Sequence, residues 1–130
     1  MYIRFAVADI DGDSGHERGV FQALDHLQRK GKLYPHEEDQ WRFLEDWFDK
    51  NLAKPSRFTG SKPPYYRKKN RAISWFKDTA HEHIRRIREM VTILENHGVA
   101  VRMLKTDRVG YVVYEDEYQV VAEAFADMRR

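Results

Sequence analysis

The chain has 130 residues and a mass of 15.6 kDa, the size of one domain with one hydrophobic core. It contains no cysteine, which excludes disulfides, zinc–thiolate sites and thiol nucleophiles and is typical of a reducing compartment. The 23 basic and 21 acidic side chains nearly cancel to a net charge of +2, so the overall charge indicates no preference for a partner.

The first elements are a strand and a helix. Residues 2–8 alternate, with Ile3, Phe5 and Val7 on one side, which is the period of a half-buried strand. The capping-box spacing of Ser14 and Glu17 then predicts a helix that starts there and stops near glycine 31.

A second helix and a long loop come next. Pro35, followed by acidic residues, is typical of the first turn of a helix, and we expect that helix to end at Lys54. Residues 54–70 contain three prolines and no apolar period, so they form a loop. Residues 71–77 resemble a strand.

The C-terminal half continues the alternation of helix and strand. Thr79 and Glu82 form a second capping box, which predicts a helix that closes at Gly98. Residues 99–106 and 111–114 are expected strands on either side of a glycine-containing turn.

The element order predicts an α+β fold. Residues 117–128 fit either a strand or a helix. The length of residues 71–106 suits a parallel βαβ crossover, and a C-terminal hairpin would extend the same sheet. We therefore expect residues 1–130 to form a single domain, with a mixed sheet of four or five strands, one βαβ crossover, a C-terminal hairpin and three helices.

Residues 71–123 carry the wording WFKD, TDR-x-GY and VVYEDE. In this wording the chain resembles a family of short, uncharacterised bacterial proteins. The family has no known activity, so the resemblance assigns no functional residue; it implies a bacterial, cytoplasmic origin. We also expect a soluble protein with no membrane partner, because residues 2–8 are too short for a signal-peptide core and are interrupted by Arg4.

Three carboxylates, Asp9, Asp11 and Asp13, follow the first strand at alternate positions. Such oxygens are ligands for a hard cation such as Mg²⁺. The run resembles the first motif of haloacid-dehalogenase-type phosphatases, which implies Asp9 as nucleophile and Asp11 as acid/base. A metal-dependent hydrolase or phosphatase is therefore one alternative. The favoured interpretation is structural, with Asp13 and Ser14 capping the helix and no catalytic residue, metal or cofactor in the cluster.

Two histidines near the start of the third helix are a weaker candidate for a metal site. A spacing of two places His81 and His83 about 200° apart around a helix, so one ion cannot easily bind both. We expect Glu82 to pair with Arg85 or Arg86 instead.

The charges are unevenly distributed. Residues 51–77 hold 8 basic and no acidic side chains, whereas residues 1–50 hold 7 basic and 11 acidic ones and residues 78–130 hold 8 and 10. We call residues 54–77 the basic segment. Cations interleaved with aromatic rings are typical of single-stranded nucleic-acid sites. The residues expected to contact an anionic partner are Lys62, Tyr65, Tyr66, Arg67, Lys68, Lys69 and Arg71.

The leading hypothesis is thus a non-enzymatic binding module for an anionic partner, with nucleic acid, another polyanion or an acidic protein surface as the candidates. Two other interpretations stay open. In one, the basic segment lies over the acidic second helix and is neutralised there. In the other, a sheet edge or the tryptophan-rich second helix, with Trp41, Trp47 and Phe48, forms a homodimer. Whether the chain is an enzyme is not decided by its sequence.

Overall fold

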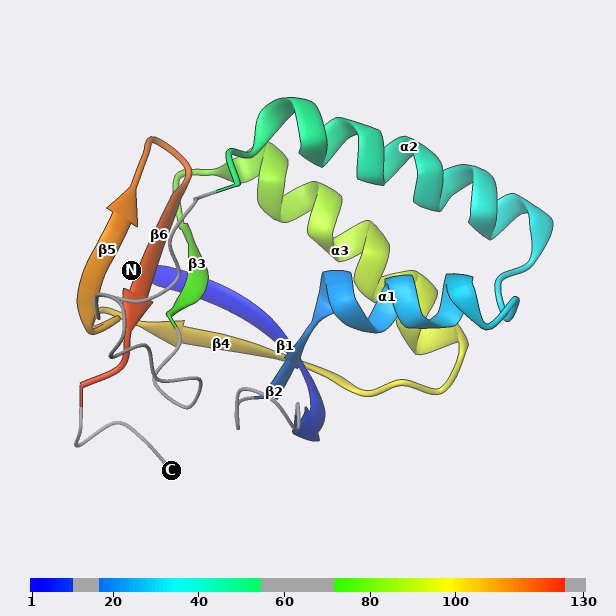
Figure 1. Cartoon of the computed structure of the whole chain (residues 1–130), viewed down its shortest axis with the longest axis horizontal. Helices are drawn as coiled ribbons and strands as arrows, with labels where there is room; N and C mark the ends of the chain where they lie inside the picture. Colours follow the sequence, from blue (N-terminus) through cyan, green and yellow to red (C-terminus); the bar gives the residue numbers. More distant parts are fainter. Residues whose placement is uncertain (11–16, 55–71, 126–130) are drawn as a thin grey trace, which may run out of the picture.

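The computed structural model describes residues 1–10, 17–54 and 72–125 (Figure 1). The elements in these ranges are β1 (Tyr2–Ile10), β2 (Glu17–Gly19), α1 (Val20–Arg29), α2 (Pro35–Asn51), β3 (Ile73–Lys77), α3 (His81–Asn96), β4 (Val101–Thr106), β5 (Tyr111–Glu115) and β6 (Gln119–Glu123). The expected α+β class, the three helices and the C-terminal hairpin are confirmed within them. The part of the ambiguous stretch at residues 119–123 is a strand.

Strand β1 is the centre of the sheet. One of its edges pairs with β4 from residue 2 to residue 7, and the other edge pairs with β3 at its start and with β2 at its end. Strand β6 pairs with β3, and β5 pairs with β6. All five pairings between described strands are antiparallel, so the expected mixed sheet is wrong.

The expected crossover is present in a different form. Because β3 and β4 are both antiparallel to β1, they run parallel to each other with β1 between them. The unit β3–α3–β4 therefore connects two strands that are separated by β1 instead of two strands that pair with each other. The local pattern predicted the order of these elements, with both strands starting earlier, at residues 71 and 99, than the observed Ile73 and Val101. It does not contain the identity of the strand that lies between them.

The three helices lie over one face of the sheet (Figure 1). The alternation of residues 2–8 is confirmed, because Ile3, Phe5 and Val7 belong to the core that the helices cover. A second, smaller cluster includes Trp75 and Val120, which point away from the helices since their chain neighbours Phe76 and Val121 are on the helix side of the sheet. None of the helices in the described ranges is long and apolar enough to cross a membrane.

Two of the expected helix starts are wrong. Helix α1 is capped by Gly19, and Glu17 lies in β2, opposite Ile10, so that Ser14 and Glu17 do not start the helix. Helix α3 has Ala80 as its N-cap without a side-chain cap, so Thr79 and Glu82 form no capping box. In the first case strand pairing overrides the local signal.

The start of α2 agrees with its sequence. Pro35 is the first helical residue, and the backbone N–H of Tyr34 donates to Glu37 Oε1 at 2.9 Å. This contact satisfies one of the donors that every helix N-terminus leaves free.

Candidate functional site

The described part of the chain brings no metal site together. Asp9 is at the end of β1 and its side chain is outside the described part of the chain, as are Asp11 and Asp13. The residues that are described contain no group of three or more His, Asp or Glu side chains that could hold an ion. The hydrolase alternative and its Mg²⁺ stay a prediction, because the side chains of these three aspartates lie outside the described residues.

The two histidines of α3 lie in different environments, because their spacing places them on different sides of the helix. His81 is exposed, whereas His83 is buried and its Nε2 is 2.7 Å from the carbonyl oxygen of Asn51. A carbonyl only accepts, so Nε2 must carry the proton. The ring of His83 also stacks on Tyr118, with centroids 4.3 Å apart. Glu82 pairs with Arg85 and with Arg86, as expected.

The predicted contact residues of the basic segment, 62–71, lie outside the described residues. What the structure gives is the frame from which that segment starts and to which it returns. The frame consists of residues 51–54, at the end of α2, and residues 72–77, which are Ala72 and strand β3.

A single buried amide joins the two sides of this frame. Gln119 of β6 is 2 % exposed. Its Nε2 donates to the carbonyl oxygen of Ala53 at 2.7 Å, and its Oε1 accepts from the hydroxyl of Ser74 at 2.8 Å. One side chain thus holds the residue before the loop and a residue after it. Since the ends are already together, the loop between them has less conformational entropy to lose when it binds.

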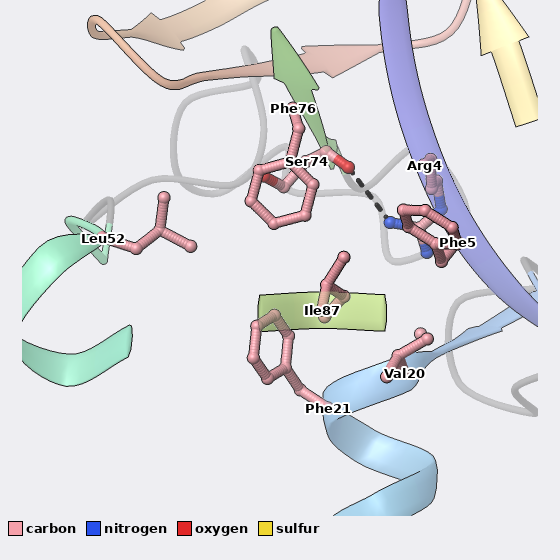
Figure 2. Close-up of a pocket in the computed structure, with 9 residues that line it drawn as sticks. Arg4, Phe5, Val20, Phe21, Leu52, Ser74, Phe76 and Ile87 are labelled. Carbon is pink, nitrogen blue, oxygen red and sulfur yellow. Dashed lines mark hydrogen bonds between the residues drawn. The ribbon is translucent and has the colours of Figure 1, made fainter. Parts of the chain in front are cut away.

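Further hydrogen bonds support the same frame from each side. His83 holds the carbonyl of Asn51, two residues before Ala53. The guanidinium of Arg4 donates to the carbonyl oxygen of Ser74 at 3.1 Å, a bond drawn in Figure 2. Both ends of the basic segment are therefore held by hydrogen bonds from buried or half-buried polar groups.

Asp116, in the turn between β5 and β6, positions Gln119. Its Oδ1 accepts from the backbone N–H groups of Tyr118 and Gln119, at 2.8 and 3.0 Å, and its Oδ2 accepts from the Tyr114 hydroxyl at 2.8 Å. Burial opposes the charge of this carboxyl, but the hydrogen bonds from Tyr118, Tyr114 and Gln119 outweigh it and lower the pKa of Asp116. The turn is thus held by a carboxylate that stays ionised at neutral pH.

The acidic face of α2 is less available than its sequence suggests. Four of its six carboxylates have a partner among the described residues: Glu37 with His97, Glu38 with Arg42, Asp46 with Lys50 and Asp49 with Lys54. Of these contacts, only the one between Lys54 and Asp49, at 2.8 Å, joins the helix to the basic segment.

At Glu45, burial and then the charges of Asp49 and Asp25 raise the pKa. Glu45 thus lies in a negative potential.

A cavity of about 80 Å³ lies between the sheet and the helices, at the break between β2 and β3 along one edge of β1. Figure 2 shows that its walls are largely apolar, with Phe5, Phe76 and Ile87 among them and Arg4 at one side. Ligand pockets are typically of about 300 Å³ or more. We therefore assign this space to packing around a sheet defect and place no ligand in it.

Comparison with known proteins adds no relative, since no protein-family model, no curated protein and no solved structure matches the chain. The resemblance of residues 71–123 to short bacterial proteins stays a prediction.

Proposed function

We propose that the chain is a binding module whose basic segment holds an anionic partner, and that this partner is a single-stranded nucleic acid. One observation carries the proposal. A stretch with 8 basic and no acidic side chains, residues 51–77, is tied at both ends to one buried amide, that of Gln119. A stretch that is charged and anchored in this way loses less entropy on binding than a free tail would.

The composition of the segment favours nucleic acid among the polyanions. Cations neutralise phosphates, and flat rings stack on bases that are not already stacked in a duplex. The segment offers both in alternation, with Phe58, Tyr65 and Tyr66 between its lysines and arginines. Three of the six α2 carboxylates pair with residues outside the basic segment, which leaves fewer acidic partners for these cations on α2.

A homodimer has less support. The β5 edge has an irregular register between Val112 and Tyr114, and the β4 edge carries Arg102 and Lys105; both features oppose pairing between sheet edges. Trp41 and Trp47 of α2 pack against the core instead of forming an exposed patch. The absence of cysteine and the bacterial resemblance favour a bacterial cytoplasm as the setting.

The test is a titration of a labelled single-stranded oligonucleotide at about 50 mM salt and above. We expect affinity to fall steeply with salt. Replacing Arg67, Lys68 and Lys69 by alanine should weaken binding for every sequence and make the slope of log affinity against log salt shallower by about 2.

A matched control changes the same charge elsewhere. Arg29→Ala, Lys30→Ala and Lys32→Ala remove three cations at the exposed end of α1. This variant should bind almost as well as the wild type. Absence of binding, binding that does not depend on salt, or an equal loss in the control variant would each contradict the proposal.

A further inference from the structure

An exposed aromatic group lies at one end of the β5–β6 hairpin. Tyr111 is 65 % exposed, the highest value among the large hydrophobic side chains in the described part of the chain. The rings of Tyr111 and Phe125 pack edge to face, with their centroids 4.6 Å apart. The guanidinium carbon of Arg108 is 4.7 Å from the centroid of Phe125. We call Arg108, Tyr111 and Phe125 the aromatic platform.

The turn before β5 fixes the backbone that leads into Tyr111. The backbone N–H of Arg108 donates to the Thr106 hydroxyl at 3.0 Å, and Val109 is buried in the second apolar cluster. Gly110 has a φ of +115°, and a Cβ at this position would lie 1.9 Å from the carbonyl oxygen of Glu123. Only glycine lets the chain approach β6 so closely. The backbone that carries Tyr111 is therefore fixed beside β6, and the Tyr111 ring packs against Phe125.

The strand register places this platform beside the basic segment. Tyr111 is opposite Glu123 on β6, and on the other side of β6 Ile73 is opposite Ala122. Ala72 therefore enters the sheet level with Glu123, two strand spacings or about 10 Å from Tyr111. Figure 1 shows the starts of β3 and β5 and the end of β6 at the same end of the sheet.

We propose that the aromatic platform is a stacking site for a base of the same single-stranded nucleic acid, with Tyr111 as the ring that contacts the base. This inference depends on the proposed function and adds a second contact to it. Base stacking on an exposed ring is sequence-tolerant and requires an unpaired strand. The carboxylates Asp107 and Glu123 lie near Tyr111 in the chain and in the strand register, and their negative charge repels phosphates. We therefore assign the phosphate contacts to the basic segment and the base contact to Tyr111.

The experiment compares two oligonucleotides of equal length, one oligothymidine and one with abasic sites throughout, on the full chain. Tyr111→Leu should weaken binding of the oligothymidine by roughly 5- to 150-fold, the range of one lost stacking contact. It should leave binding of the abasic strand and the salt slope unchanged, because no phosphate contact is removed. Tyr111→Phe keeps the ring and should restore wild-type affinity.

Phe43→Leu is the matched control, since Phe43 is another exposed aromatic residue, at 53 %. It also has an arginine beside its ring, with the guanidinium carbon of Arg86 5.1 Å from the ring centroid. The control variant should bind both strands as the wild type does. The inference is wrong if Tyr111→Leu binds oligothymidine like the wild type, or if it loses equal affinity for both strands. If the wild type binds neither strand, the proposed function fails and the platform with it. Melting curves of each variant show that the fold is intact.

Discussion

The two ends of α2 are both attached to the rest of the molecule by buried polar groups, but by groups of different kinds. At the N-terminal end, Glu37 accepts from the Tyr34 N–H and lies 2.7 Å from His97 Nε2, at the end of α3. At the C-terminal end, the carbonyls of Asn51 and Ala53 contact His83 and Gln119. The first attachment uses a carboxylate and the second uses an imidazole and an amide that bond to carbonyl oxygens.

This difference separates stability from function. The Glu37 attachment joins α2 to the end of α3 and does not involve the basic segment. The Gln119 attachment continues directly into the basic segment, and Gln119 reaches across to Ser74 on its far side. We therefore expect changes at the first end to alter the stability of the whole domain, and changes at the second to alter the basic segment as well.

The largest effect is expected from Glu37→Ala. It leaves the ring of His97 and the N–H of Tyr34 without their acceptor, in a place where the side chain of Glu37 is only 3 % exposed. Loss of one partner of a buried pair costs about 3 kcal/mol of unfolding free energy. Urea denaturation at neutral pH measures it, and Glu38→Ala, at the exposed pair with Arg42, should cost well under about 1 kcal/mol.

The Glu37 attachment should also depend on pH. Burial opposes its charge, but the hydrogen bonds from Tyr34 and His97 and the charges of His97 and His36 lower its pKa below the ordinary value of 4.5. Since the folded pKa is the lower one, the stability from Glu37 is complete above about pH 4.5 and is lost as the pH falls through the folded value. The difference between wild type and Glu37→Ala should therefore shrink in acid. A constant difference would contradict this account.

A smaller loss is expected from Gln119→Leu. The substitution keeps the volume of the side chain but leaves the Ala53 carbonyl and the Ser74 hydroxyl without a partner, at a cost of about 2 kcal/mol. Unlike Glu37→Ala, it should also raise the rate at which trypsin cuts within the basic segment, measured well below the melting temperature. If cleavage rises no more than in Glu37→Ala, Gln119 stabilises the domain without holding the segment.

The smallest effect is expected from Ser74→Ala. This change removes one hydroxyl and leaves the Gln119 bond to Ala53 in place, so it should cost about 1 kcal/mol. Tryptic cleavage of the segment should be intermediate between wild type and Gln119→Leu. Cleavage as fast as in Gln119→Leu would show that the bond to Ala53 contributes little.

Local signals in the sequence predicted much of the fold. The alternation of Ile3, Phe5 and Val7 gave the central strand, and Pro35 with Glu37 gave the start of α2. The signals that were wrong are those overridden by distant partners. Glu17 pairs with Ile10 in the sheet instead of capping a helix, and β1 lies between β3 and β4 where the sequence suggested neighbours.

The hydrogen bonds of the frame were not predicted from the sequence either, because they too join residues that are distant in the chain. Gln119 reads as one polar residue in an apolar strand, and its partners Ser74 and Ala53 are 45 and 66 residues away in the chain. One signal was present: Asp116 followed by two N–H donors in a turn is a common local motif, and it marks where β6 begins. The contact residues of the basic segment stay a prediction from charge and aromatic content alone.

The most direct measurement is a map of backbone amide chemical shifts during titration with oligothymidine. We expect the shift changes to gather in the basic segment and in residues 108–111, and the amide signals of Tyr34 and Glu37, at the other end of α2, to stay unchanged. Absence of shift changes, or changes gathered at the N-terminal end of α2, would contradict the proposal.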